Sequence, residues 1–193
     1  LWPSVNLDVW KGDSPEPEMR VVAIGSASFV KGTMDTIDML AGTDLVCHHV
    51  GGGSEEDLAI LRDHAKRKEV DFVVEPRLSQ EALVSLVKGS LAVVSLARNE
   101  PFGLTPIEAQ AAGTPALMVD EGGYQHTVKD GVSGRLLPRG DWSTWHAALE
   151  EAKDSDNRTA WSEAGQAQIA EMGLRPEDQA ETLRKIVSKL RDQ

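Results

Sequence analysis

Short apolar runs alternate with amphipathic stretches over the first 140 residues of this chain. The apolar runs predict strands at Arg20–Ile24, Asp44–His49, Asp71–Val74, Leu91–Leu96, Ala116–Val119 and Gly134–Leu137. The stretches between them predict helices at Thr33–Ala41, Glu55–Arg67, Gln80–Lys88 and Pro106–Ala112, and a short helix near Tyr124–Lys129. Strands that alternate with helices of this length are typical of βαβ units and a parallel sheet. The run LAVVSL at 91–96 shows no alternation, as expected of a strand covered on both faces.

From Asp141 onward the pattern is helical only. It predicts helices at Trp142–Lys153, Asn157–Met172 and Pro176–Asp192, with Gly173 as a C-terminal stop. The predicted fold class is therefore α/β: a Rossmann-like, doubly wound parallel sheet of about six strands with a C-terminal helical annex. We expect three parts: a linker segment over 1–19, a core over 20–140, and helices packed on that core over 141–193.

Composition narrows the class of protein. A chain of 193 residues fits one domain, and its net charge of −11 argues against nucleic acid or an anionic membrane as a partner. Cys47 is the only cysteine, which favours a reducing, cytoplasmic compartment. No apolar run is long enough to span a bilayer. The opening LWPSVNLDVW has no start methionine, and we expect the chain to be part of a larger protein.

In doubly wound sheets, ligands bind at the carboxyl ends of the strands, so the loops after Ile24, His49, Val74, Leu96 and Val119 are the ones to consider. Three of these five loops contain glycine, which lets the backbone approach a ligand closely. The neighbouring Cys47, His48 and His49 could suggest a metal site. However, strand alternation sends the two histidines to opposite faces, and we predict no metal.

The segment RNEPFGLTPIEAQAAGTPALMVDEGG, at 98–123, carries the most chemical information. Thr105, Pro106 and Glu108 fit a capping box at a helix start, so Glu108 could simply cap its own helix. Glu100 lies on the preceding loop, where it could be a solvated charge. Helix starts bind phosphate, and carboxylates beside one suit sugar hydroxyls. Together they indicate a site for a sugar linked to a nucleotide.

The spacing of these residues closely resembles the signature of the family-4 retaining glycosyltransferases of the GT-B fold, E-x-F-G-L-x-x-x-E-A. Residues 100–109 match each fixed position, and Gly113, Gly122-Gly123 and Asp130-Gly131 fit the continuation. Residues 3–8 resemble the family's segment after the crossover between its two domains, with Asn6 where Asp is usual. The resemblance implies that the chain is one half of a GT-B fold: the C-terminal, donor-binding domain, without the N-terminal acceptor domain.

The resemblance also implies roles for individual residues. The catalytic pair would be Lys31, which balances the diphosphate, and Glu100, which accepts hydrogen bonds from the transferred sugar. Glu108 would hold the ribose. The other donor-binding residues would be Gly25 and Ser26 on the first loop, Arg77 on the loop Glu75-Pro76-Arg77, and the backbone of Phe102, Gly103, Leu104 and Thr105. The implied partner is a nucleoside diphosphate sugar, with no cofactor, and any membrane association would come from the missing part.

Three departures from the family pattern keep alternatives open. Ser26 stands where the family carries a second cation, Arg, and Leu96-Ala97 replaces a common Pro-Ser. His126 stands where Glu is usual. Arg98 could compensate for the missing arginine. The first alternative is a nucleotide-sugar-binding module that transfers nothing, and the second is another GT-B enzyme such as a sugar epimerase.

Overall fold

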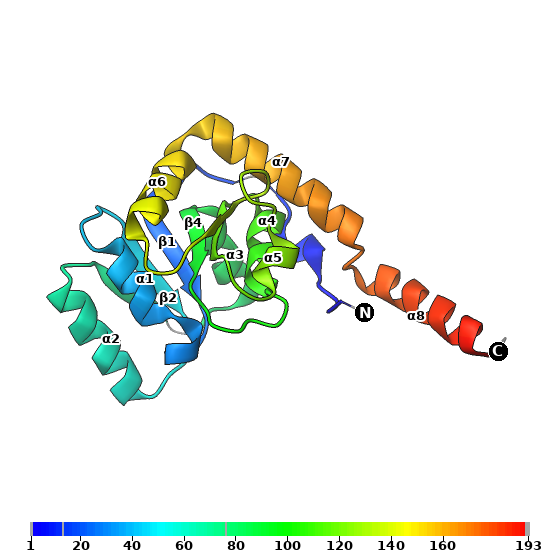
Figure 1. Ribbon diagram of the computed structural model, residues 1–193, viewed down its shortest axis with the longest axis horizontal. Coiled ribbons are helices and arrows are strands. Elements are labelled where there is room, and N and C mark those ends of the chain that lie inside the picture. The colour runs from blue at the N-terminus through cyan, green and yellow to red at the C-terminus, as the bar shows by residue number, and fades with distance from the viewer. Residues whose placement is uncertain (1, 13, 76, 192–193) are drawn as a thin grey trace.

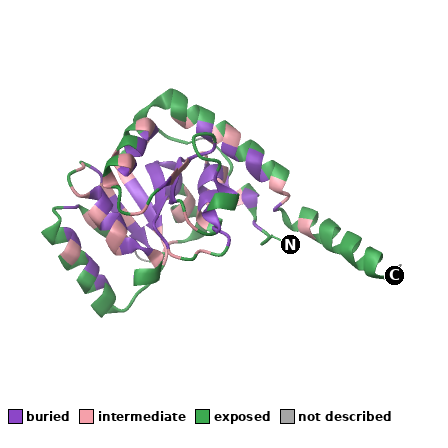
Figure 2. Ribbon diagram, viewed as in Figure 1, coloured by how far each residue is buried: buried purple, intermediate pink, exposed green. Residues whose placement is uncertain are grey.

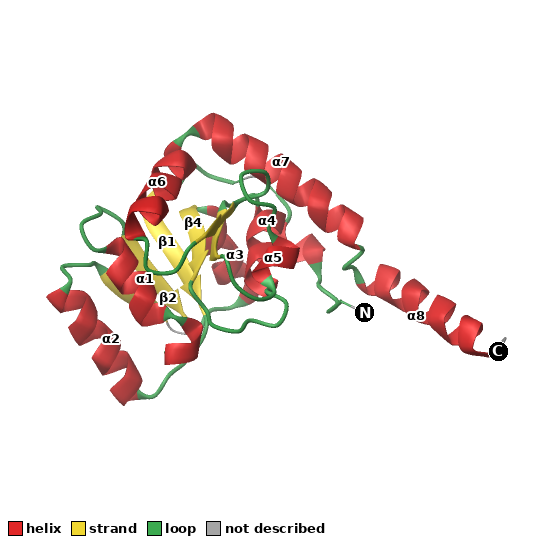
Figure 3. Ribbon diagram, in the orientation of Figure 1, coloured by secondary structure: helices red, strands yellow, loops and turns green. Residues whose placement is uncertain are grey.

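The computed structural model describes residues 2–12, 14–75 and 77–191. Its centre is a parallel sheet flanked by helices (Figures 1 and 3). The sheet has six strands in the order β3-β2-β1-β4-β5-β6. The strands are β1 (Glu18–Ile24), β2 (Val46–Val50), β3 (Phe72–Glu75), β4 (Ser90–Ser95), β5 (Ala116–Val119) and β6 (Arg135–Leu137). This is the order of a Rossmann fold, so the predicted fold class is confirmed.

Helices cover both faces of the sheet. The helices are α1 (Thr33–Leu40), α2 (Glu55–Arg67), α3 (Gln80–Lys88), α4 (Leu104–Ala112), α5 (Tyr124–Thr127), α6 (Trp142–Lys153), α7 (Ser155–Met172) and α8 (Pro176–Arg191). Helices α1, α2 and α6 contact one another or the sheet on one face, and α3 and α4 lie on the other. Helix α7 crosses from α6 to pack along α4 (Figure 1).

The sheet is the centre of the core. Every residue of β4 and β5 is buried, which confirms the prediction of a strand covered on both faces from the run at 91–96. Figure 2 shows the same contrast: the central strands are buried, and the outer faces of the helices are exposed. Trp145 of α6 is fully buried and packs into this core.

Local signals explain most helix boundaries. Helix α2 begins with a complete capping box between Ser54 and Asp57. Helix α7 begins at Ser155, two residues before the predicted start, because the Asp154 side chain accepts from the amides of Asp156 and Asn157. Gly173 ends α7 in the left-handed conformation, as predicted.

The prediction that all the C-terminal helices pack on the core is wrong for α8. None of the residues Pro176–Arg191 is buried, and the helix extends away from the body (Figures 1 and 2). The predicted last residue of this helix, Asp192, lies outside the described residues. None of the helices in the described part of the chain is long and apolar enough to cross a membrane.

The N-terminal segment packs against the rest of the domain. It contains a short 3-10 helix, η1 (Leu7–Trp10), whose Leu7 and Trp10 are buried. The Val5 amide donates to the Leu174 carbonyl at 2.8 Å. This contact brings the two ends of the domain together beside α4.

Candidate functional site

Two loops meet where the strand order reverses, between β1 and β4. The loop after β1 contains the 3-10 turn η2 (Phe29–Lys31), and the loop after β4 carries Glu100. Lys31 Nζ donates to Glu100 Oε2 at 2.9 Å, with the side chains 38% and 20% exposed. The structure therefore brings together the two residues predicted as the catalytic pair, at the position where open α/β sheets bind ligands.

Close backbone contacts hold these loops against their neighbours. A Cβ on Gly32 would lie 2.0 Å from the Leu96 carbonyl oxygen, and one on Gly123 would lie 2.4 Å from Phe102 Cα. Only glycine fits at both positions. The Gly123 amide also donates to the Glu100 carbonyl at 2.7 Å, so the paired glycines after β5 fix the backbone of Glu100.

Helix α4 begins at Leu104, and the predicted capping box at its start is wrong. Gly103 occupies the N-cap with φ +89°, and none of the described side chains caps the helix. Thr105 is the second helical residue, so Glu108 lies beyond capping reach. The left-handed glycine starts the helix two residues earlier than the box predicted and leaves its first amides without a side-chain acceptor.

Glu108 instead faces a groove. It lines a hollow of about 430 Å³ together with Leu104 and, from other segments, with Asn6, Trp10 and Leu78. The structure gives its carboxylate no hydrogen-bond partner among the described residues. Burial raises the pKa of Glu108 to about 7, because the charged form loses solvation that nothing replaces. Such a carboxylate gains from any ligand that offers hydroxyl donors.

A second hollow of about 500 Å³ adjoins the first. Its lining is Ile24, Gly25, Val50, Gly51, Gly52, Arg77, Leu78 and Leu83, from the loops after β1, β2 and β3 and from α3. Leu78 and Leu83 line both hollows, so the hollow beside Gly25 and the hollow beside Glu108 are neighbours. Gly25 and Arg77 are thus near each other, while Pro76 lies outside the described residues.

The side chain of Phe102 is structural. It is buried in a small apolar cluster with Val5 and Ile107, so only its backbone can reach a ligand. The exposed ring of Trp2 stacks on it at a centroid distance of 4.9 Å, and the His126 ring lies 6.1 Å from Trp2.

Arg98 is not free to take the place of the arginine that the family carries at the position of Ser26. Its Nη2 lies 2.6 Å from Asp35 Oδ2, and its guanidinium stacks over the Phe29 ring at 4.1 Å. Ser26 itself hydrogen-bonds Ser28 at 3.0 Å between their hydroxyl oxygens. In this arrangement Lys31 pairs with Glu100, and the Arg98 guanidinium is held by Asp35 and Phe29 instead.

The two histidines of β2 lie on opposite faces, as predicted. His48 Nδ1 lies 2.6 Å from Glu75 Oε1, whereas His49 is fully buried beside Phe72. Burial lowers the pKa of His49, which keeps its ring neutral. Within residues 2–12, 14–75 and 77–191, no three His, Cys, Asp or Glu side chains are grouped so as to hold a metal ion.

Comparison with known proteins decides the family. Residues 5–168 match the family model described as "Glycosyl transferases group 1", which covers most of the chain. This chain belongs to the group 1 glycosyl transferases. The assignment confirms the resemblance carried by the segment from Glu100 to Glu108.

Individual members agree with this assignment. The chain is 37% identical over 172 residues to D-inositol 3-phosphate glycosyltransferase of Mycolicibacterium smegmatis, covering 80% of this chain and 39% of the relative. Its fold is similar to sucrose-phosphate synthase of Thermosynechococcus elongatus, with a TM-score of 0.84 and 22% identity, over 97% of this chain and 51% of that one. It is also similar to Anabaena HepE in complex with UDP and glucose, with a TM-score of 0.79 and 19% identity, over 94% and 55%.

The coverage shows that this chain corresponds to only part of its relatives. The chain spans less than two fifths of the curated relatives and about half of the two solved structures. With the Rossmann-like sheet and the C-terminal helices, this matches the C-terminal domain of a GT-B fold.

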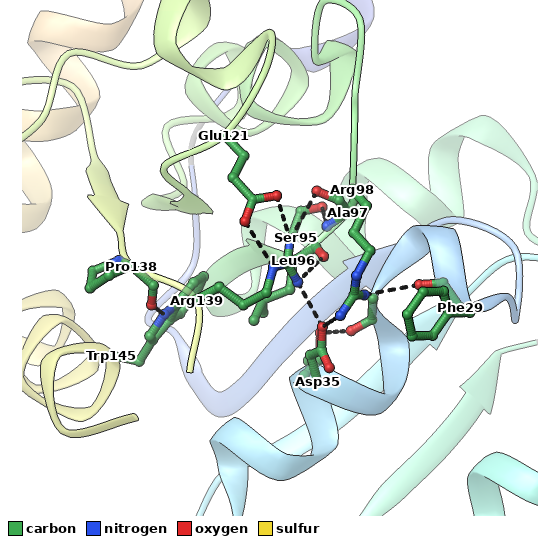
Figure 4. Close-up of polar contacts among 12 residues, drawn as sticks. Phe29, Asp35, Ser95, Leu96, Ala97, Arg98, Glu121, Pro138, Arg139 and Trp145 are labelled. Atoms are coloured by element: carbon green, nitrogen blue, oxygen red, sulfur yellow. Dashed lines mark hydrogen bonds and ion pairs between the residues drawn. The ribbon is translucent and has the colours of Figure 1, made fainter. Parts of the chain in front are cut away.

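Sequence reasoning missed three charged residues near the site: Asp35, Glu121 and Arg139. They form ion pairs with one another beside the loop that leads to Glu100 (Figure 4). Arg139 follows β6, and the rule that ligands bind at carboxyl ends of strands applies to that loop as well. Extending the rule to the loop after Leu137 would have found it.

Proposed function

We propose that this chain is the donor-binding domain of a retaining family-4 glycosyltransferase, which transfers a hexosyl group from a nucleoside diphosphate sugar to an acceptor hydroxyl. The observation that carries the proposal is the contact between Lys31 and Glu100 at the strand-order reversal. A cation for a diphosphate and a carboxylate for sugar hydroxyls are thus adjacent, beside an uncapped helix start.

The groove next to this pair supports the same ligand. A base would fit the part lined by Gly25, Gly51 and Arg77, where the walls are largely backbone and apolar side chains. The ribose would then reach Glu108, whose carboxylate accepts its hydroxyls. The amides at Gly103, Leu104 and Thr105 would face the distal phosphate and the sugar, together with the backbone of Phe102 and Ser26.

The reaction we propose breaks the bond between the sugar anomeric carbon and the diphosphate oxygen. Lys31 stabilises the negative charge that develops on the departing diphosphate. Glu100 holds the sugar hydroxyls while the anomeric carbon is oxocarbenium-like. The acceptor hydroxyl attacks the same face, its proton passes to the departing phosphate, and the configuration is retained.

Relatives support the class of donor. The curated relatives include D-inositol 3-phosphate glycosyltransferases, and the HepE structure contains UDP and glucose. The acceptor would be bound by an N-terminal domain outside this chain, so we expect this chain alone to transfer nothing. The cytoplasmic compartment expected from the single cysteine stays a prediction, as does the division at residues 19 and 140.

Calorimetric titration of this chain with UDP, GDP, ADP and their glucose or mannose conjugates tests the proposal. We expect one base to bind saturably and Lys31→Ala to weaken that binding. Lys68→Ala is the matched control, because Lys68 pairs with Asp38 at 2.8 Å and is similarly exposed, but it follows the end of α2 and is not among the proposed donor-binding residues. The absence of binding at millimolar concentrations, both here and in the full-length protein, would contradict the proposal.

A second candidate is a binding module that transfers nothing, and Ser26 favours it. One cation in place of two weakens neutralisation of a diphosphate. The full-length protein separates the two candidates: a donor that binds without forming a glycosylated product indicates the binding module. Inversion of the sugar hydroxyl configuration without an acceptor would indicate a sugar epimerase of the same fold.

A further inference from the structure

Arg139 lies in the loop after β6 and extends across the carboxyl edge of the sheet (Figure 4). Its guanidinium forms a two-pronged ion pair with Glu121, with Nε to Oε1 and Nη2 to Oε2 both at 2.8 Å. Its Nη1 donates to Asp35 Oδ2 at 2.6 Å. One side chain therefore joins the loop after β5 to the first turn of α1.

The same guanidinium also reaches the loop that leads to Glu100. Arg139 Nη1 donates to the Leu96 carbonyl at 2.9 Å. Arg98 Nη2 also lies 2.6 Å from Asp35 Oδ2. Leu96 and Arg98, on the two sides of Ala97, therefore belong to one network of polar contacts. The network holds two arginines and two carboxylates, and its charges cancel.

This network lies beside the loops that carry the candidate pair, and none of its hydrogen bonds is to Lys31 or to the Glu100 side chain. Glu121 comes two residues before Gly123, whose amide holds the Glu100 carbonyl at 2.7 Å. Asp35 comes four residues after Lys31, in the helix that this loop starts. Arg139 thus joins, through separate bonds, the helix that follows Lys31, the end of the strand that precedes Glu100, and the loop whose Gly123 amide holds the Glu100 carbonyl.

We propose that Arg139 is a positioning residue, which fixes the loops of Lys31 and Glu100 in register for a nucleoside diphosphate sugar; this rests on the function proposed above. The guanidinium makes two parallel bonds to Glu121 and further bonds to Asp35 and to the Leu96 carbonyl, whereas an ammonium has only three donors and no planar fork. Binding of the sugar should depend most strongly on this register, because the sugar hydroxyls must meet a carboxylate at a fixed distance from the diphosphate.

Arg135 provides a matched control on the same strand. Its side chain is 21% exposed against 22% for Arg139, and it also pairs with two carboxylates, those of Asp130 and Glu151. It braces the far side of β6 and none of the site loops. A purely structural role for Arg139 predicts that Arg139→Met and Arg135→Met behave alike.

The test is titration of both variants with the nucleotide that binds the wild-type chain and with its glucose conjugate. We expect Arg139→Met to reduce the affinity ratio of conjugate to bare nucleotide about tenfold, with less than a threefold change for the bare nucleotide. Arg135→Met should keep the wild-type ratio, and Arg139→Lys should recover only part of it. An unchanged ratio in Arg139→Met would overturn the positioning role.

Hydrogen exchange of the ligand-free chain gives a second readout. Amides of residues 28–33 and 97–103 should exchange faster in Arg139→Met and at the wild-type rate in Arg135→Met. Equal exchange in the two variants would also overturn the inference. If the wild-type chain and the full-length protein bind no nucleotide, the proposed function fails and this inference fails with it; if the wild type binds and Arg139→Met keeps its ratio, only the inference fails.

Discussion

Lys31 and Glu100 are 69 residues apart in the chain, yet their side chains form a hydrogen-bonded ion pair of 2.9 Å at the reversal of strand order. Each of these side chains is therefore already paired with the other, although a nucleotide-sugar donor would need both. A diphosphate must compete with Glu100 for Lys31, and the sugar must compete with Lys31 for Glu100. The ion pair therefore affects the relative affinity of the site for the diphosphate and for the sugar.

Glu100→Gln should separate these two contributions. The amide no longer neutralises Lys31, so the affinity for bare nucleoside diphosphate should rise about two- to fivefold, the range of a half-exposed ion pair. The extra affinity of the sugar conjugate should fall, because an amide accepts hydrogen bonds from the sugar hydroxyls less strongly than a carboxylate. Calorimetry with both ligands measures the two effects. Weaker binding of the bare nucleotide would mean that Glu100 does not compete for Lys31.

Glu108 should make stability depend on pH. Its pKa is about 7 in the folded chain against 4.5 in the unfolded chain, so the folded state binds more protons between these values. The free energy of unfolding should therefore fall as the pH rises from 5 to 7, and Glu108→Gln should remove this loss. We expect the variant to gain about 1–3 kcal/mol on the wild type between pH 5 and pH 8. Urea unfolding at several pH values measures it.

Glu56→Gln, on the exposed side of α2, is the control for this experiment. It removes the same charge without removing a buried carboxylate, so its pH profile should follow that of the wild type. A wild-type profile for Glu108→Gln as well would show that the groove does not desolvate Glu108.

Gly123→Ala should destabilise the fold and displace the Glu100 loop. The new Cβ would lie 2.4 Å from Phe102 Cα and 2.5 Å from the backbone N and C of the same residue, so the backbone itself would have to move. We expect a loss of about 1–3 kcal/mol in the free energy of unfolding. At Gly52 a Cβ meets nothing within 4 Å, so Gly52→Ala should leave stability unchanged or slightly raised. Denaturant unfolding of the two variants compares them, and equal values would argue against close contact at Gly123.

Removing α8 should cost this chain little. None of its residues is buried, and its apolar side chains Leu183, Ile186, Val187 and Leu190 are exposed. A chain that ends at Arg175 should unfold within about 0.5 kcal/mol of the longer one. Leu174→Ala, one residue earlier, should cost about 2–5 kcal/mol, because Leu174 is fully buried beside Val5 and Ile169. A large loss on truncation would mean that α8 packs on the body in solution.

The alternation of apolar runs and amphipathic stretches determined the class of fold, the number of strands and the existence of every long helix. Periodicity records burial, and burial repeats along a strand or helix, so these elements are readable in one dimension. The Glu100-to-Glu108 spacing likewise identified the family, because one loop and one helix start carry the whole signature.

Only the tertiary structure decided what each site residue faces. Glu108 fits a capping box in sequence, yet the left-handed Gly103 starts the helix earlier and leaves Glu108 in a groove. The network of Asp35, Glu121 and Arg139 joins residues up to 104 positions apart, and no local pattern records such a pairing. The sequence also predicted α8 from its periodicity but not its separation from the core, because an apolar stripe indicates that a helix needs a partner without naming the partner.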